Sequence, residues 1–235
     1  MKICTFNIRN DYFDYKKEKS NIIYNYLKDN NIDILGLQEV FSKPNRDLKK
    51  LIKNDYKMIG KYRFLLPLLH FTSNEKTPII TNHEIVESTT YRLPHKPSKL
   101  RRVMTHVVIK YNDKEISIYN THLEARIKSV KDEQLKFIIE ILKNDERPKI
   151  LIGDFNSKIT DKCFIDFIKK IEKLNMNKVD INEKTFKEEK ENYSIDHIFI
   201  DNSFKLIKKE VVKTLGISDH YPIVVEIGEV WIINI

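Results

Sequence analysis

The feature that most constrains the fold is a series of short apolar runs of strand length, several of which end in a polar side chain. Apolar runs of this length, rich in β-branched and aromatic residues, predict strands. Such runs cover residues 2–8, 33–40, 77–81, 102–111, 115–123, 149–156, 195–200 and 222–227. These strands are too many for a single small sheet, so the pattern indicates more than one sheet.

Between the strands, apolar residues recur at helical spacing in three segments, 16–31, 130–144 and 161–174. Residues 102–111 and 115–123 follow each other across Asn112 and Asp113, a sequence typical of a hairpin turn. Hairpins and strand-helix alternations in one chain indicate an α/β fold of two mixed sheets packed together, with the helices outside. The polar or Pro-bearing stretches 60–76, 88–101 and 177–194 are expected to be loops over one rim of this sandwich.

Composition places the chain among ordinary globular proteins, and we expect one domain over residues 1–235. Neither a secretory signal nor an apolar run of membrane-spanning length is visible, which predicts a cytoplasmic protein without membrane insertion. Cys4 and Cys163 lie far apart in apolar stretches, so we expect reduced thiols. The net charge of +8 favours an anionic partner, although the lysines are scattered among acidic residues as on any solvated surface.

Carboxylates follow or precede several of the apolar runs directly. Glu39 follows ILGLQ, Asp154 follows ILIG, and Asp219 comes just before PIVV. One such residue alone would be an ordinary cap or turn residue, but the repetition favours a shared site at one end of the packed sheets. Five further polar residues occupy similar positions and are expected to join that site: Asn7, His122, Asn156, Asp196 and His220.

The ligand types in this set indicate which metal the site would hold. Carboxylate and amide oxygens predominate and thiolates are absent, which favours Mg²⁺ or Mn²⁺ over zinc. Mg²⁺ binds few carboxylates and keeps coordination positions for water and phosphate oxygens. Metal-assisted hydrolysis of a phosphoester is therefore the predicted reaction.

Six motifs, in their order along the chain, resemble those of the endonuclease/exonuclease/phosphatase superfamily, and the resemblance runs from residue 1 to about residue 227. The motifs are TFNIR (5–9), LQEV (37–40), NTHL (120–123), GDFN (153–156), IDHIF (195–199) and SDHYP (218–222). The resemblance implies the DNase I-like fold, a four-layered α/β/β/α sandwich of two mixed β-sheets with flanking helices.

The resemblance also implies roles for the residues that match these motifs. Glu39 would be the principal metal ligand, with Asn7 and Asp219 completing the metal-facing wall directly or through water. Asp154 would orient or deprotonate the attacking water, and Asn156 would hold that water or a phosphate oxygen. His220 would contact the scissile phosphate, and Asp196 would fix its tautomer and favour the imidazolium.

A second histidine, His122, resembles the one found in the DNase I-like and sphingomyelinase-like branches, and Glu75 stands where its carboxylate partner would be. Of the pair Arg101 and Arg102, we expect Arg102 to contact the substrate phosphate, together with Asn120 of the NTHL motif. The remaining histidines are expected to be structural: His70, His83, His95, His106 and His197.

The motifs identify the reaction and leave the substrate open, because this family hydrolyses DNA, RNA, inositol phosphates and sphingomyelin with one catalytic core. The leading hypothesis is a nuclease acting on DNA or RNA, which the positive charge supports. The alternative is a phosphatase or phosphodiesterase for a phospholipid, an inositol phosphate or another small phosphoester. A non-catalytic binding protein on the same fold is disfavoured, because every residue of the expected site is present. The sequence gives no indication of an obligate protein partner.

Overall fold

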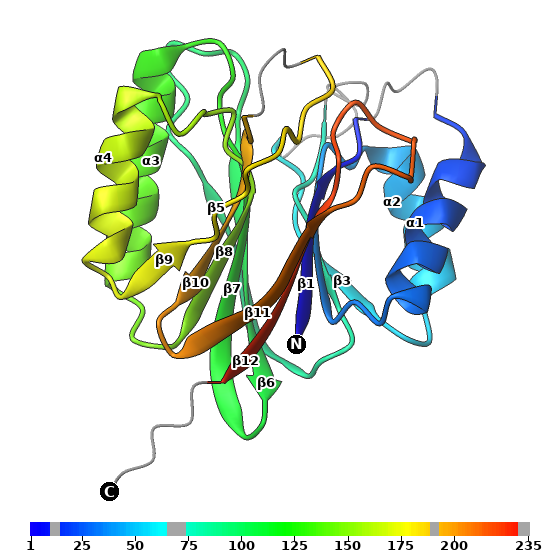
Figure 1. Ribbon diagram of the computed structural model, residues 1–235. Helices are drawn as coiled ribbons and strands as arrows, with labels where there is room; N and C mark the ends of the chain where they lie inside the picture. The colour runs from blue at the N-terminus through cyan, green and yellow to red at the C-terminus, as the bar shows by residue number, and fades with distance from the viewer. Residues whose placement is uncertain (10–14, 65–73, 189–192, 230–235) are drawn as a thin grey trace, which may run out of the picture.

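The computed structural model describes residues 1–9, 15–64, 74–188 and 193–229. Twelve strands and four helices are assigned in these ranges (Figure 1). In chain order they are β1 Lys2–Asn7, α1 Lys17–Asp29, β2 Ile34–Gln38, α2 Ser42–Ile52, β3 Lys57–Ile59, β4 Ile79–Thr81, β5 Ile85–Arg92, β6 Val103–Tyr111, β7 Lys114–His122, α3 Lys128–Lys143, β8 Lys149–Asp154, α4 Lys162–Glu172, β9 Met176–Lys178, β10 Asp196–Asp201, β11 Phe204–Val211 and β12 Ile223–Glu229.

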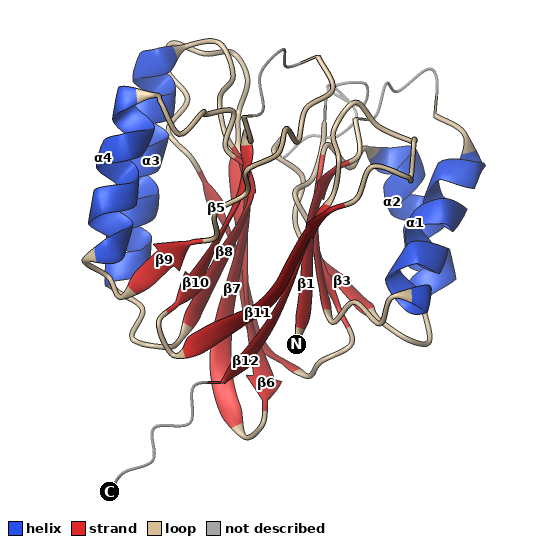
Figure 2. Ribbon diagram, viewed as in Figure 1, coloured by secondary structure: helices blue, strands red, loops and turns tan. Residues whose placement is uncertain are grey.

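The strands form two mixed six-stranded sheets that pack face to face. The first sheet has the order β11-β12-β1-β2-β4-β3, and the second has the order β5-β6-β7-β8-β10-β9. Helices α1 and α2 lie outside the first sheet, and α3 and α4 lie outside the second (Figure 2). This arrangement confirms the expected four-layered α/β/β/α sandwich.

Three apolar clusters fill the spaces between the four layers. The central cluster lies between the sheets and consists mainly of β-branched residues from both, such as Ile3, Ile34, Ile118 and Ile152. Two outer clusters pack the helices onto the sheets, one under α1 and α2 and one under α3 and α4. Because both faces of the central strands are buried, these strands read in the sequence as continuous apolar runs.

Strand direction decides where the polar residues gather. The β1–β2 pair and the β7–β8 pair are parallel, and the other strand pairs in the two sheets are antiparallel. As a result, eight strand ends meet at one end of the sandwich. Four strands finish there, namely β1, β2, β7 and β8. Four others start there, namely β4, β6, β10 and β12. We call this end of the sandwich, which holds Asn7, Glu39, His122 and Asp154, the polar end; it is uppermost in Figure 1.

The structure confirms the hairpin between β6 and β7, whose turn residues Asn112 and Asp113 both have positive φ angles, 47° and 62°. Both cysteines are free, with Cys4 buried and Cys163 half-buried, as expected for reduced thiols.

Five elements were not predicted, namely α2, β3, β5, β9 and β11. The expected loop 88–101 was wrong in its first part because β5 continues to Arg92, and the expected loop 177–194 was wrong at Asn177 and Lys178, which belong to β9. Four of these elements are edge strands or very short strands, and β5 and β11 are largely exposed, so their sequences lack a buried apolar pattern. Residues 65–73 of the expected loop 60–76, and His70 with them, lie outside the described residues.

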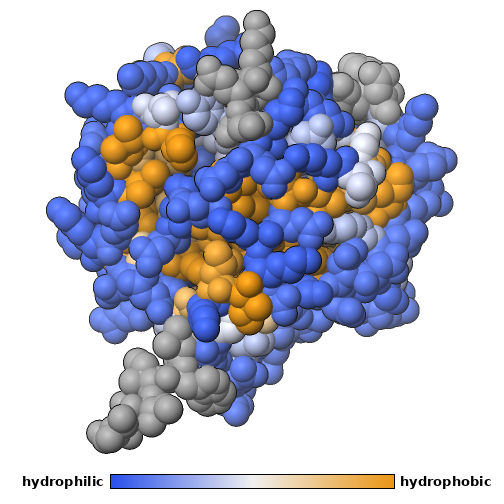
Figure 3. All heavy atoms as spheres, in the orientation of Figure 1, coloured by the Kyte–Doolittle hydropathy of each residue, from blue (hydrophilic) through white to orange (hydrophobic). Residues whose placement is uncertain are grey.

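The surface shown in Figure 3 is mostly hydrophilic, with apolar side chains in separate patches. Large exposed apolar side chains in the described ranges are scattered over different elements, as with Val86 on β5 and Ile207 on β11. Isolated apolar residues of this kind are normal on a folded surface.

Gly153 lets β8 approach β7 closely just before Asp154. Its φ is +147°, and a Cβ atom at this position would collide with the backbone of Thr121, its partner on β7. We expect Gly153→Ala to lower the free energy of unfolding by about 3 kcal/mol, because the neighbouring backbone has no room to move. Urea denaturation measures the difference.

Gly216→Ala is the matched control, since Gly216 also has a positive φ of +65° but no atom within 4 Å of the added Cβ. It should lose only about 1 kcal/mol, the cost of the left-handed backbone. Equal losses in the two variants would show that the close approach of β7 to Gly153 is unimportant.

Candidate functional site

The polar end brings side chains from both sheets into contact. Asn7 ends β1, and its Nδ2 donates hydrogen bonds to Glu39 Oε1 (3.2 Å) and to Asp154 Oδ2 (2.9 Å). Glu39 follows β2 in the first sheet, whereas Asp154 ends β8 in the second. One amide therefore joins two carboxylates across the sandwich.

The backbone turns sharply after three strands at this end. Arg9, Glu39 and Asn156, which follow β1, β2 and β8, have φ angles of 31°, 59° and 48°. Residues other than glycine seldom adopt positive φ, and such residues cluster at functional sites. At Glu39 this conformation ends β2 at Gln38, two residues earlier than the apolar pattern predicts, and it separates the carboxylate from the sheet ladder.

Asp154 is almost fully enclosed, with 1% of its surface exposed. Its Oδ2 atom lies 3.5 Å from His122 Nε2 and 3.8 Å from His220 Nε2, and its Oδ1 atom accepts a hydrogen bond from the Asn156 backbone. Burial alone would raise the pKa of Asp154, but the two imidazoles and the N–H donors outweigh it and lower the pKa. Asp154 is therefore a carboxylate at neutral pH.

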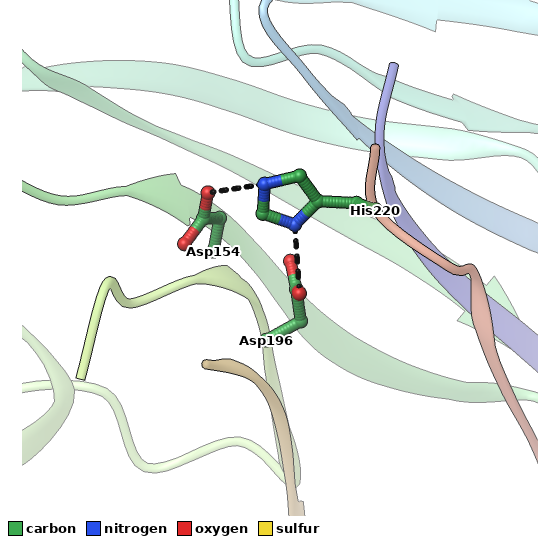
Figure 4. A group of neighbouring side chains, drawn as sticks. All are labelled: Asp154, Asp196 and His220. Atoms are coloured by element: carbon green, nitrogen blue, oxygen red, sulfur yellow. Dashed lines mark hydrogen bonds and ion pairs between the residues drawn. The ribbon is translucent and has the colours of Figure 1, made fainter. Parts of the chain in front are cut away.

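His220 lies between two aspartates, as Figure 4 shows. Its Nδ1 atom is 2.9 Å from Asp196 Oδ2, and its Nε2 atom faces Asp154. Burial would lower the pKa of His220, but the charges of Asp196, Asp154 and Asp219 raise it to about 10. His220 is thus an imidazolium at neutral pH, oriented by Asp196 in the way the sequence analysis expects.

A second ionic cluster surrounds Glu75, which is buried before β4. Its Oε1 atom accepts hydrogen bonds from Arg102 Nη1 (2.6 Å) and Arg63 Nη1 (2.9 Å) and lies 3.5 Å from His122 Nδ1. Burial would raise the pKa of Glu75, but the two guanidinium groups hold it well below its usual range. Arg63 was not predicted as a site residue, because it belongs to no motif and follows the unpredicted strand β3.

Asn120 lies deeper between the sheets than the other predicted residues. Its Nδ2 donates to the carbonyl oxygens of Leu37 (2.9 Å) and Pro78 (2.8 Å), and its Oδ1 accepts a hydrogen bond from Gln38 (2.7 Å). The Asn120 side chain is fully buried. It therefore ties the two sheets together, and the predicted contact with a substrate phosphate has no geometric support here.

Two further predicted residues lie at the margin of the cluster. Asn156 donates from Nδ2 to the carbonyl of Leu123 (3.0 Å). Asp219 forms an ion pair with Arg9, whose Nη1 is 2.6 Å from Asp219 Oδ2. The adjacent Ser218 hydroxyl donates to the Asn7 carbonyl, so the SDHYP segment is held against the end of β1.

The donor set fits a hard divalent cation. Glu39 and Asp154 direct oxygens at the same Asn7 nitrogen, which concentrates negative charge where a cation would neutralise it. Rotation of the Asn7 amide by half a turn would direct Oδ1, a possible metal ligand, toward the two carboxylates in place of Nδ2. Asp154, Asp196 and His220 also have potential ligand atoms within 4.8 Å of one another. The proton on His220 opposes binding there, because a metal ligand must be neutral imidazole.

Comparisons with known proteins identify the family of the chain and structures that share its fold. Residues 4–220 match the model of the Endonuclease/Exonuclease/phosphatase family. No curated protein sequence matches the chain.

Several solved structures share the fold. A mannosyl-6-phosphatase from Bacteroides thetaiotaomicron is 22% identical, with a TM-score of 0.81 over 97% of this chain and 99% of that one. An endonuclease/exonuclease/phosphatase from Bacteroides vulgatus is 23% identical, with a TM-score of 0.82 over 97% and 98%. The human Nocturnin catalytic domain, solved with bound sulfate, is 20% identical, with a TM-score of 0.77 over 98% and 93%.

The chain belongs to the endonuclease/exonuclease/phosphatase family and is an enzyme of the phosphoester hydrolase type, for which dependence on a divalent metal is typical. Among the described residues, no helix is long and apolar enough to cross a membrane.

We expect Asp196→Asn to lower the pKa of His220 from about 10 toward its ordinary value near 6.5, because it removes the nearest negative charge. The raised pKa stabilises the fold fully below about pH 6.5, and this stabilisation is lost as the pH rises through about 10. The stability deficit of the variant should therefore shrink over that range. NMR titration of His220 and urea denaturation at several pH values measure both effects.

Asp201→Asn, at the opposite end of β10, is the control and should leave the titration of His220 unchanged. A His220 pKa that stays near 10 in Asp196→Asn would contradict the assigned pair.

Proposed function

We propose that this protein is a divalent-metal-dependent phosphodiester hydrolase that acts on DNA or RNA. The observation that carries the proposal is the position of the Asp154 carboxylate, which is buried and faces the Nε2 atoms of His122 and His220. The carboxylate is suited to accept a proton from water, and the imidazoles are suited to contact phosphate. The net charge of +8 supports a polyanionic substrate.

In this proposal, Asp154 accepts a hydrogen bond from the attacking water and takes its proton as the new oxygen–phosphorus bond forms. The bond from phosphorus to the leaving oxygen breaks in the same displacement, and the leaving oxygen departs with the bonding electrons and takes a proton from solvent water. His220 is an imidazolium and stabilises the negative charge that develops on the phosphoryl oxygens. Asp196 holds the His220 ring through Nδ1, so that Nε2 faces the reacting group.

Glu39 and Asn7 are the proposed metal ligands, with Asp219 beside them at the margin, and Mg²⁺ or Mn²⁺ is the proposed ion. When bound, the ion supplies Lewis-acid polarisation of a phosphate oxygen. Asn156 donates one amide hydrogen bond to the Leu123 carbonyl. The rest of its amide group is proposed to help hold the attacking water or a phosphate oxygen.

A small phosphoester is the second candidate, because one similar structure is a mannosyl-6-phosphatase. The dependence of activity on salt concentration distinguishes a nucleic-acid substrate from a small phosphoester. Added salt weakens binding of a polyanion steeply, whereas a small substrate is affected much less.

The test is a parallel assay with Mg²⁺, Mn²⁺ or EDTA on supercoiled plasmid, an abasic duplex and RNA. A second set of substrates contains phospholipids, inositol phosphates and mannose 6-phosphate. We expect metal-dependent cleavage of nucleic acid, and Asp154→Asn should lower the rate about 10²–10⁴-fold while the fold is kept. Turnover of a small phosphoester alone would refute the nuclease proposal, and wild-type rates in Asp154→Asn would refute the role of Asp154.

Glu39→Gln tests the metal site separately. We expect the Mg²⁺ concentration for half-maximal activity to rise about 10-fold or more, because a neutral amide replaces the charged ligand. Glu226→Gln is the control, since Glu226 on β12 pairs with Lys2, at the opposite end of β1 from Asn7. An unchanged metal titration in Glu39→Gln would overturn the ligand assignment.

A further inference from the structure

A buried arginine contacts both His122 and Glu75, the carboxylate expected to be the partner of His122. Arg102 Nη1 lies 2.8 Å from His122 Nδ1 and 2.6 Å from Glu75 Oε1. The direct separation of His122 Nδ1 from Glu75 Oε1 is 3.5 Å, beyond the 2.7–3.2 Å of an ordinary N–H···O hydrogen bond. All three side chains are buried. Of the two groups that face His122 Nδ1, Arg102 is therefore the nearer and the one within hydrogen-bonding distance.

The donor and acceptor counts of these atoms decide where the proton of His122 lies. A guanidinium nitrogen of this kind carries two hydrogens and no available lone pair, so it only donates. The two hydrogens of Arg102 Nη1 match the two acceptors around it, Glu75 Oε1 and His122 Nδ1. A hydrogen on His122 Nδ1 would point at a hydrogen of Arg102. The geometry thus requires a lone pair on Nδ1, which leaves the proton on Nε2.

We propose that Arg102 is a positioning residue that holds His122 as the neutral Nε2–H tautomer, so that His122 donates a hydrogen bond to the phosphate and transfers no proton. This inference rests on the proposed phosphoester hydrolysis for its catalytic part. His122 Nε2 is 3.5 Å from Asp154 Oδ2, so its N–H group faces the reacting region. Arg102 itself is engaged with Glu75 and His122 and takes this role in place of the predicted phosphate contact.

Arg63 completes the arrangement from the first sheet. It donates to the same Glu75 oxygen as Arg102 and is almost fully buried, at 4% exposure. With two guanidinium groups on one oxygen, Glu75 stays ionised and fixes the direction of Arg102. The two histidines at the polar end then differ in charge. His220 has a carboxylate on Nδ1 and is cationic, whereas His122 has a guanidinium there and is neutral.

The first experiment reads the tautomer directly and needs no substrate. Protein labelled with ¹⁵N-histidine is examined at neutral pH by long-range ¹H–¹⁵N correlation, and His122 is assigned from the signals that disappear in His122→Gln. We expect a neutral ring with an unprotonated Nδ1 and a protonated Nε2. A proton on Nδ1, in a neutral or a charged ring, would overturn the proposal.

Arg102→Met in the same experiment tests whether the arginine sets the tautomer. Its fold is first checked by near-UV circular dichroism. We expect Nδ1 of His122 to become protonated toward Glu75 once the guanidinium is gone, a change that a purely structural arginine would not produce. An unchanged tautomer would show that Arg102 does not hold it. Arg101→Met is the neighbouring control and should leave the His122 signals unchanged.

The second experiment measures kcat/KM on whichever phosphoester the protein hydrolyses. Glutamine carries an N–H donor near the position of His Nε2 but cannot transfer a proton, whereas alanine has no donor. We expect His122→Gln to stay within about 10-fold of wild type and His122→Ala to lose about 10²–10³-fold, as for removal of one oxyanion donor. Equal losses in both variants would refute the donor role. Inactivity of the wild-type protein on every phosphoester would refute the proposed function. The NMR experiment would still test the tautomer of His122, because it does not depend on activity.

Discussion

The structure depends on keeping acidic side chains ionised inside the protein. Asp154, Asp196 and Glu75 are each at most 5% exposed, and an isolated carboxylate at such a depth would take up a proton. Asp154 and Glu75 are instead placed against cations or N–H donors that outweigh burial, namely two imidazoles and an amide for Asp154 and two guanidinium groups for Glu75. Burial raises the pKa of Asp196, and the His220 imidazolium beside it offsets part of that rise. The proposed hydrolysis depends on these charges, because the ionised Asp154 accepts a proton from water and Asp196 keeps His220 cationic.

This compensation requires residues from both sheets, and the strand directions bring them together. Parallel pairing of β1 with β2 and of β7 with β8 sends four strand ends to the polar end, where the antiparallel neighbours begin. Beneath them, Gln38 and Asn120 hydrogen-bond across the gap between the sheets and fix their spacing. The LQEV and NTHL motifs thus each combine a residue that joins the sheets with a residue at the site.

Much of the fold was predictable because the central strands are buried on both faces and their apolar runs are continuous. The edge strands β5 and β11 were not predictable on the same grounds, since their side chains are largely exposed and their sequences are polar. Helix α2 was missed for a similar reason. Its buried apolar side chains, Leu48 and Ile52, are too few to show a helical period, and most of its other residues are charged or polar.

The two-sheet α/β class could be predicted from the chain alone, because strand periodicity and motif order are local properties. The same holds for the set of strand-end residues that includes Asn7, Glu39, Asp154 and His220. Only the tertiary structure decided which of these side chains touch. Packing brought Arg63 to Glu75, buried Asn120 between the sheets, and placed Arg102 in contact with both Glu75 and His122. The physical reason is that hydrogen-bond partners and protonation depend on distances between residues far apart in the chain, and only packing of the two sheets sets those distances.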